Sequence, residues 1–193
     1  VFCLDAIQDP LSLQEPVYND GDDSIYIMDQ VKDKKNTDEQ WTENLTINEA
    51  LKKLNSGEIT SVELTRAYLN RIEQYGTDLN CYITVTPERA MADAAASDAR
   101  RASGNALPLD GIPMAMKDLF ATRGIRTTAA SRMLENFVPE YESTVSQNLI
   151  NAGTVLLGKA NLDEFAMGTF SKTSFFGAPV NPWQMEKRLT AGG

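Results

Sequence analysis

The sequence predicts an α/β fold, and three observations support this prediction. Apolar residues recur at helical spacing after Thr46 and again after Thr60. Short apolar runs at 81–85, 112–117 and 154–157 have the length of strands. A capped helix lies between the last two runs. The resulting order of strand, helix and strand predicts a right-handed βαβ crossover. We therefore expect a parallel or mixed sheet flanked by helices, preceded by an irregular acidic N-terminal arm.

Four helices are expected, each between a start signal and a stop signal. The start signals are capping-box pairs, or a proline at the first helical position. Most stop signals are glycines just beyond the apolar pattern. These signals predict helices over 46–57, 60–76, 87–104 and 144–150. The pairs that resemble capping boxes are Thr46–Glu49, Thr60–Glu63, Thr144–Gln147 and Asn161–Glu164.

Charge divides the chain into two segments. The net charge is −9, and residues 1–44 hold eleven acidic side chains against three lysines, a net −8. This asymmetry indicates that 1–44 and 45–193 have different origins, and that 1–44 does not form a domain by itself. The acidic segment argues against direct binding to nucleic-acid phosphates. The start at Val1 suggests that the true start has been removed.

The composition excludes several kinds of site. The chain has no histidine, so it cannot form a Ser-His-Asp triad, a Cys-His pair or a zinc site of the HExxH type, and we expect no metal. Cys3 and Cys81 are too few for a disulfide framework and fit reduced thiols in the cytoplasm. The sequence shows neither an apolar run of membrane-spanning length nor a signal peptide.

Lys117 is the leading catalytic candidate. It ends the segment Asp110-Gly-Ile-Pro-Met-Ala-Met-Lys-Asp118, which predicts a buried strand. Most lysines lie in water. A lysine drawn out of water loses hydration, and its neutral amine becomes accessible as a general base toward a serine hydroxyl.

The run 111–193 resembles the amidase signature family. The matching pieces are Asp110–Asp118, Thr127-Thr-Ala-Ala-Ser131, Gly158-Lys-Ala-Asn-Leu-Asp-Glu-Phe-Ala-Met-Gly168 and Asn181-Pro-Trp183. Within the family, Leu134-Glu-Asn-Phe-Val-Pro139 and Asp163–Gly168 are most similar to the A subunits of glutamyl-tRNA(Gln) amidotransferases. The likeness extends over about 45–193, and it implies an amidase-signature fold of which this chain holds an incomplete, N-terminal part.

The resemblance implies a Ser-cisSer-Lys triad in which Lys117 is the lysine. It implies an acyl-enzyme route that releases ammonia from glutamine for conversion of Glu-tRNA(Gln) to Gln-tRNA(Gln). The partners implied are the amidotransferase subunits B and C, with ATP and magnesium used by the partner and no cofactor in this chain. Both serines of the family would lie beyond residue 193, so we expect residues 1–193 alone to be inactive.

Three further motifs receive weaker interpretations. By resemblance Met167 and Gly168 line the substrate pocket, although a helix end with a C-terminal glycine explains them equally well. Asn161 with Glu164 is most simply a capping box. Asn181-Pro-Trp183 predicts a structural turn with a packed indole.

Residues 1–44 resemble a different family. Ile7-Gln-Asp-Pro-Leu-Ser-Leu13, Glu15–Gly21, Ile25–Gln30 and Asp38-Glu-Gln-Trp41 are similar to the acidic linker of a sporulation-type RNA polymerase sigma factor. The junction is expected between Trp41 and Glu58, and the chain would then be a chimera of two truncated parents. Any binding to RNA polymerase core would be expected only through residues 1–44.

Two alternatives to the amidotransferase fragment stay open. One is a general amide hydrolase of the same family, and the other is a polymerase-binding fragment derived from a sigma factor. For an incomplete sheet we also expect exposed apolar surface, and hence poor solubility or a partly molten state.

Overall fold

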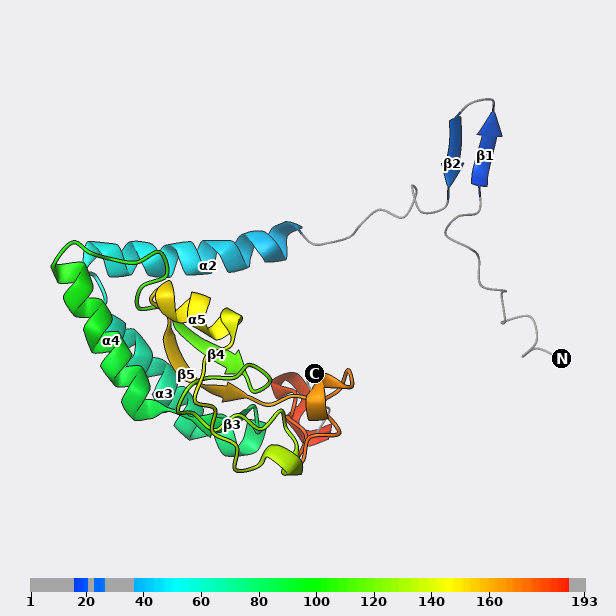
Figure 1. Cartoon of the computed structure of the whole chain (residues 1–193). Helices are drawn as coiled ribbons and strands as arrows, with labels where there is room; N and C mark the ends of the chain where they lie inside the picture. Colours follow the sequence, from blue (N-terminus) through cyan, green and yellow to red (C-terminus); the bar gives the residue numbers. More distant parts are fainter. Residues whose placement is uncertain (1–15, 21–22, 27–36, 188–193) are drawn as a thin grey trace. The chain divides into compact units, whose positions relative to one another are not determined.

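The computed structural model describes residues 16–20, 23–26 and 37–187 of the 193-residue chain. By its internal contacts the chain divides into two units, Val1–Leu45 and Thr46–Gly193. In the first unit β1 (Pro16–Asp20) and β2 (Asp23–Tyr26) pair as an antiparallel hairpin, shown in blue in Figure 1. This hairpin is an addition to the irregular arm that the sequence predicts. Cys3 lies outside the described residues.

The remaining elements follow the order that the sequence predicts. The helices are α2 (Thr37–Ser56), α3 (Ser61–Leu79), α4 (Pro87–Ala102) and α5 (Thr144–Asn151). The strands are β3 (Tyr82–Val85), β4 (Pro113–Lys117) and β5 (Val155–Ala160). Three short 3-10 turns are η1 (Arg132–Leu134), η2 (Glu164–Ala166) and η3 (Pro182–Lys187). Among the described residues, none of the helices combines the length and apolar character that a membrane span needs.

The sequence predicted a helix start correctly where side chains next to that start form a capping box. At α3 the Thr60 hydroxyl accepts from the Glu63 N–H at 3.1 Å, and the Glu63 carboxylate accepts from the Thr60 N–H at 2.9 Å. The prediction of a helix start at Thr46 is wrong, because α2 begins at Thr37. No glycine or proline interrupts 37–56, so nothing local ends the helix on the N-terminal side of Thr46.

Two other helix ends differ from the prediction. Helix α3 continues past Gly76 to Leu79, and Asn80 caps it with a left-handed backbone (φ 50°). An asparagine tolerates this conformation better than most residues, so it serves as the stop signal. Helix α5 is capped by Ser143, whose hydroxyl accepts from the Ser146 N–H at 3.2 Å, rather than by Thr144.

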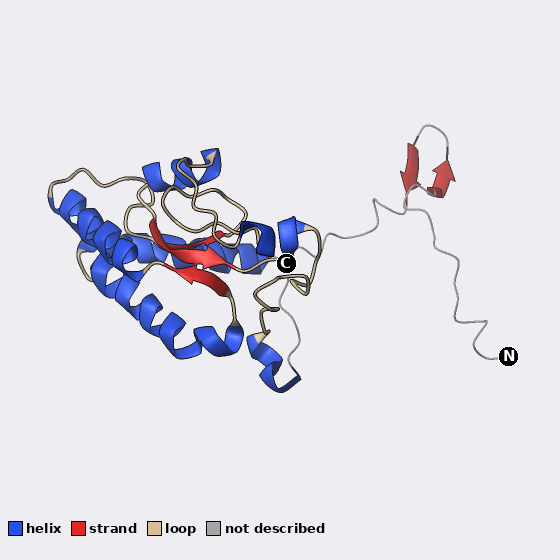
Figure 2. Cartoon of the chain, turned by 60° about the horizontal axis from the view of Figure 1, so that its bottom comes forward, coloured by secondary structure: helices blue, strands red, loops and turns tan. Residues whose placement is uncertain are grey.

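The sheet has the strand order β3-β5-β4. Strands β4 and β5 are parallel and joined through α5, which confirms the predicted parallel pair. Strand β3 lies antiparallel on the other edge of β5, so the sheet is mixed. Figure 2 shows these strands in red between layers of helix and loop.

Each face of the sheet has its own core. On one face, Ala90 and Ala94 of α4 pack against Val155 and Leu157 of β5, with apolar residues of α3 around them. On the other face, Met116 and Leu156 pack with Ile125 and with Leu149 of α5. The chain therefore builds a three-layer arrangement in which one central strand serves two cores.

A β-bulge interrupts the pairing of β5 with β4. Met114 pairs with Leu156 and Ala115 pairs with Gly158, so Leu157 is an extra residue on β5. A Cβ at Gly158 would collide with the carbonyl oxygen of Thr84 and lie 3.0 Å from the Cα of Val85. Glycine is required here because β3 approaches the bulge closely.

Buried acidic side chains fix the approach to β4. Asp110 is fully buried, and its carboxylate accepts from the Arg100 Nε at 3.1 and 3.2 Å. Burial acts to raise the pKa of Asp110, but the hydrogen bonds from Arg100 and the Leu107 N–H outweigh it and hold the pKa below its ordinary value. From α4, Asp98 accepts the first N–H groups of α3. These bonds fix α3 and the start of β4 relative to α4.

Candidate functional site

Lys117 is the last residue of β4, and it pairs in register with Ala160 of β5. Met116 packs into the core on the α5 side, so by strand alternation Lys117 points to the opposite face. Lys117 is only half-buried, and β4 includes the exposed Ala115. The prediction of a buried strand is therefore wrong within the described sheet, because β4 has a neighbour on one edge only.

The amine of Lys117 has no hydrogen bond or ion pair within the part of the chain that the structure describes. In the described residues the Lys117 side chain is therefore not held by another polar group. Its role as a general base stays a prediction from the sequence.

A second lysine, Lys159 of β5, is fully buried. Its Nζ donates to the carbonyl oxygen of Phe120 at 2.6 Å and to the hydroxyl oxygens of Thr127 at 2.9 Å and Thr122 at 3.1 Å. It lies 3.6 Å from the Oδ1 of Asp118, which is also fully buried. The sequence analysis missed this residue, although it follows an apolar run just as Lys117 does.

Hydrogen-bond directions indicate that Lys159 is protonated. The Thr122 hydroxyl donates to the Phe120 carbonyl and the Thr127 hydroxyl donates to the Ile125 carbonyl, both at 3.1 Å. Both hydroxyl oxygens therefore act as acceptors toward Lys159, which uses all three N–H donors of an ammonium group. Burial holds the pKa of Lys159 below its ordinary value, and the carboxylate of Asp118 offsets only part of that effect.

Asp118 connects this buried charge to the loops beyond β4. Its Oδ2 accepts from the N–H of Thr128 at 2.8 Å and from the hydroxyl of Thr128 at 2.5 Å. Its backbone N–H donates to the Ala160 carbonyl, and its own carbonyl accepts from the Ala129 N–H, each at 3.0 Å. Oδ1 accepts no hydrogen bond, so Lys159 is its counterion. The residue next to Lys117 is thus fixed through both its backbone and its side chain.

Left-handed backbone conformations gather in the two loops beside this centre. Non-glycine residues with positive φ in these loops are Ala129 (49°), Ala130 (55°), Phe165 (52°), Ala166 (59°) and Ser171 (51°). The loops are joined by the Phe165 N–H bonded to the Ala129 carbonyl and the Phe175 N–H bonded to the Ala130 carbonyl, each at 2.9 Å. Such conformations cost about 1–3 kcal/mol each and cluster at functional sites.

Met167 and Gly168 lie in the second of these loops. The Met167 side chain is 80% exposed, and a Cβ at Gly168 would lie 2.5 Å from the carboxyl carbon of Asp163. Neither residue lines one of the described pockets, and Met167 faces solvent. Their role in binding substrate stays a prediction.

Asp163 organises the loop that carries them. Its carboxylate accepts from the N–H groups of Phe170, Ser171 and Thr173 and from the Thr173 hydroxyl, at 2.8–3.1 Å. Burial acts to raise the pKa of Asp163, and these hydrogen bonds more than reverse that effect. Asp163 therefore holds the exposed loop in one conformation.

Two smaller interpretations of this region need correction. Asn161 is not half of a capping box, because its Oδ1 accepts from the Leu162 N–H and the Ser174 hydroxyl instead. The predicted turn at Asn181 is present, with its side chain accepting from the Trp183 N–H at 3.0 Å. The indole is not packed, since Trp183 is 90% exposed.

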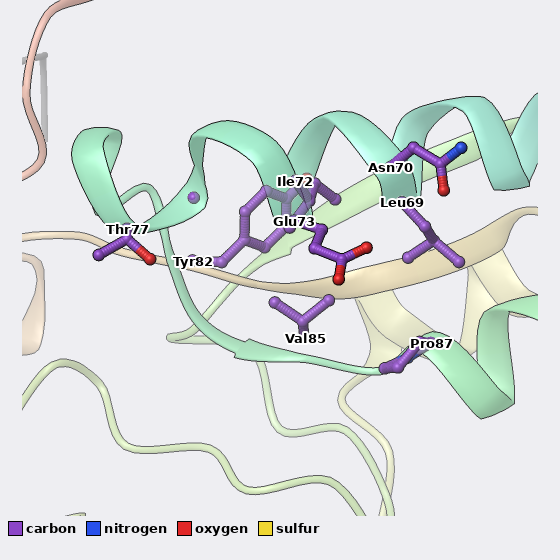
Figure 3. Close-up of a pocket in the computed structure, with 9 residues that line it drawn as sticks. Leu69, Asn70, Ile72, Glu73, Thr77, Tyr82, Val85 and Pro87 are labelled. Carbon is purple, nitrogen blue, oxygen red and sulfur yellow. The ribbon is translucent and has the colours of Figure 1, made fainter.

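An open cavity of about 480 Å³ lies elsewhere, between α3, β3 and the start of α4. Figure 3 shows Leu69, Ile72 and Val85 among its lining side chains, with the carboxylate of Glu73 beside them. None of the predicted site residues lines it. The candidate site is therefore the end of β4 with its two loops, rather than this cavity.

Comparison with known proteins agrees with this architecture. The family model described as Amidase matches residues 63–193. The A subunit of glutamyl-tRNA(Gln) amidotransferase from Caulobacter sp. (strain K31) is 56% identical over 152 residues, covering 77% of this chain and 31% of the relative. The chain thus spans about a third of the length of the curated relatives it matches.

Two solved structures show the same fold. A bacterial aryl acylamidase of the amidase signature family superposes with a TM-score of 0.69 at 28% identity, over 76% of this chain and 31% of that one. The A subunit of glutamyl-tRNA(Gln) amidotransferase from Thermotoga maritima superposes with a TM-score of 0.54 at 32% identity, over 69% of this chain and 26% of that one. With a family match over more than half of its residues, the chain belongs to the amidase family.

Proposed function

We propose that residues 46–193 form the lysine-bearing part of a glutamyl-tRNA(Gln) amidotransferase A subunit. The whole enzyme to which this part belongs would hydrolyse glutamine and supply ammonia for converting Glu-tRNA(Gln) to Gln-tRNA(Gln). The observation that carries the proposal is the half-buried Lys117, whose side chain has no polar partner among the described residues and which is followed directly by the fully buried Asp118. The 56% identity to an amidotransferase A subunit supports this substrate over other amides.

Lys117 would act as the base of the triad. A neutral amine at the end of β4 takes the proton of a bridging serine, which in turn takes the proton of the nucleophilic serine. The nucleophile attacks the side-chain amide of glutamine, ammonia leaves, and water clears the acyl-enzyme. The serines of this chain do not match either position of the family's pattern, so we predict that residues 1–193 by themselves do not hydrolyse glutamine.

Partners and location follow from the same proposal. The amidotransferase subunits B and C would bind the protein in the cytoplasm, and ATP and magnesium would be used by the partner. The family match begins at residue 63 and says nothing about 1–44. Binding of RNA polymerase core through 1–44 therefore stays a prediction from the sequence.

A hybrid enzyme tests the function. Residues 46–193 are followed by the downstream part of the Caulobacter relative, co-expressed with the B and C subunits of that organism. We expect glutamine-dependent ammonia release, and a loss of about 10⁴-fold or more in kcat on Lys117→Ala, as for other triad members. Lys172→Ala is the matched control, since that exposed lysine lies in the Met167 loop.

The substrate separates the two candidate enzymes. Hydrolysis of glutamine with tRNA amidation supports the amidotransferase. Hydrolysis of aryl amides without action on glutamine would replace it with a general amidase. Unchanged glutamine hydrolysis in Lys117→Ala would remove the assigned role of this lysine.

A further inference from the structure

The buried pair Lys159–Asp118 takes no part in the proposed chemistry, yet it is the most fully enclosed charged group near Lys117. Both side chains are 0% exposed. Removing two charges from water is expensive, and hydrophobic residues of similar volume often give equal or greater stability. A gain in stability alone therefore does not explain why Lys159 and Asp118 form a fully buried ion pair.

The bulge explains why Lys159 faces this side of the sheet. Without Leu157 as an extra residue, strict alternation would place position 159 on the face of Val155. With the bulge, Lys159 pairs with Met116 and shares its face. The lysine therefore reaches the loop that follows β4, while Lys117 points away on the opposite face.

Two short paths lead from Lys159 to the backbone of Lys117. In the first, Lys159 Nζ holds the Phe120 carbonyl at 2.6 Å, and the Phe120 N–H donates to the Lys117 carbonyl at 3.1 Å. In the second, Lys159 neutralises Asp118, the residue bonded covalently to Lys117. Each path contains only groups that are within contact distance of one another.

We propose that Lys159 is a positioning residue that fixes the backbone of Lys117 through Phe120 and Asp118; this rests on the proposed role of Lys117 as the base. Without the ammonium group, the Asp118 carboxylate is left buried with no counterion. It must draw in water or turn outward, and either movement releases the 117–120 turn. The amine of Lys117 then loses its fixed direction without any change in its own chemistry.

The full chain carrying Lys159→Met provides the test. A short pulse of acetic anhydride is followed by mass spectrometry, which gives the acylation rate of each lysine. We expect the rate at Lys117 to rise severalfold, while Lys172, in another loop, keeps its wild-type rate. An unchanged rate at Lys117 in a folded protein would overturn the proposal.

A double variant separates positioning from simple packing. Lys159→Met with Asp118→Asn keeps an amide oxygen for the Thr128 N–H and removes the uncompensated charge. We expect the Lys117 rate to return part of the way to the wild-type value, because the bond from Lys159 to the Phe120 carbonyl stays lost. A double variant that behaves like Lys159→Met would show that Lys159 only fills space, and the proposal would be wrong.

Thr127→Val provides a milder variant should Lys159→Met fail to fold. It removes one of the three acceptors of Lys159 and should give a smaller rise at Lys117, whereas no rise would count against the proposal. These labelling rates involve no turnover. If the hybrid enzyme does not hydrolyse glutamine, the proposed amidotransferase function is wrong. The acylation rates of Lys117 would still test whether Lys159 positions it.

Discussion

Lys117 and Lys159 lie on adjacent parallel strands, one residue out of register, and their side chains leave opposite faces of the sheet. Lys117 pairs with Ala160, and Lys159 pairs with Met116. Each follows an apolar run, so the local sequence does not distinguish them. One amine is fully enclosed by acceptors and the other is half-buried without a partner in the described structure. Neighbouring strands thus place the same kind of side chain in two different environments.

Replacing the two lysines should have very different effects on stability. Lys159→Met leaves the buried Asp118 without a counterion and should lower the free energy of unfolding by about 3–5 kcal/mol. Lys117→Met removes no described contact and should change it by less than about 0.5 kcal/mol. Urea denaturation followed by circular dichroism measures both. Equal effects would show that the two lysines are not in different environments.

Gly158 should not tolerate a side chain. Gly158→Ala places a Cβ against the Thr84 carbonyl and should cost about 1–3 kcal/mol, as overpacking does. Gly76→Ala is the control, because Gly76 lies inside α3 and its new Cβ would meet only the Ile72 side chain at 3.7 Å. That variant should be stabilised by about 0.5–1 kcal/mol. The two urea midpoints should therefore move in opposite directions.

Tyr82 should make stability fall at alkaline pH. Burial, with smaller effects from Cys81 and Tyr68, raises the pKa of Tyr82 to about 12 from its ordinary value of 10.0. Because the folded protein holds this proton more tightly than the unfolded chain does, the contribution is complete below pH 10.0 and is lost as pH rises toward 12. Absorbance at the tyrosinate band should show one late-titrating tyrosine, absent in Tyr82→Phe. A Tyr82→Phe protein with the same alkaline loss of stability would contradict this assignment.

Exposed apolar side chains in the loops should make the isolated chain poorly soluble. Met133, Met167, Phe170 and Trp183 are 84%, 80%, 61% and 90% exposed. Of the two outcomes expected from the sequence, we favour low solubility over a molten state, because buried residues pack into a core on each face of the sheet. The dye ANS should bind, and light scattering should show self-association. A monomer that binds no dye would contradict the prediction.

The elements that the sequence predicted are those decided locally. The capping box at Thr60 and Glu63 fixes the start of α3 within one turn, and it is present. The parallel pair β4–β5 followed from two apolar runs separated by one capped helix. The start at Thr46 failed because a capping pattern inside a continuous helical run does not act as a start.

The candidate site was only partly predictable for the same reason. Lys117 could be selected because a family motif marks it. The enclosure of Lys159 depends on acceptors at Phe120, Thr122 and Thr127, more than thirty residues earlier in the sequence. Its direction depends on a bulge that breaks strand alternation. Neither the position of these acceptors nor the bulge can be predicted from a pattern of apolar and polar residues.

The bulge also gives the two faces of β5 different sensitivity to a shortened strand. Deleting Leu157 would remove the extra residue, and Lys159 would stay opposite Met116 on the face that holds its acceptors. The other face would lose the leucine that packs against Ala90 and Ala94, and Gly158, which has no side chain, would take its place opposite Ala115. A single-codon deletion in this strand would thus leave the buried charge in place and open a cavity in the opposite core.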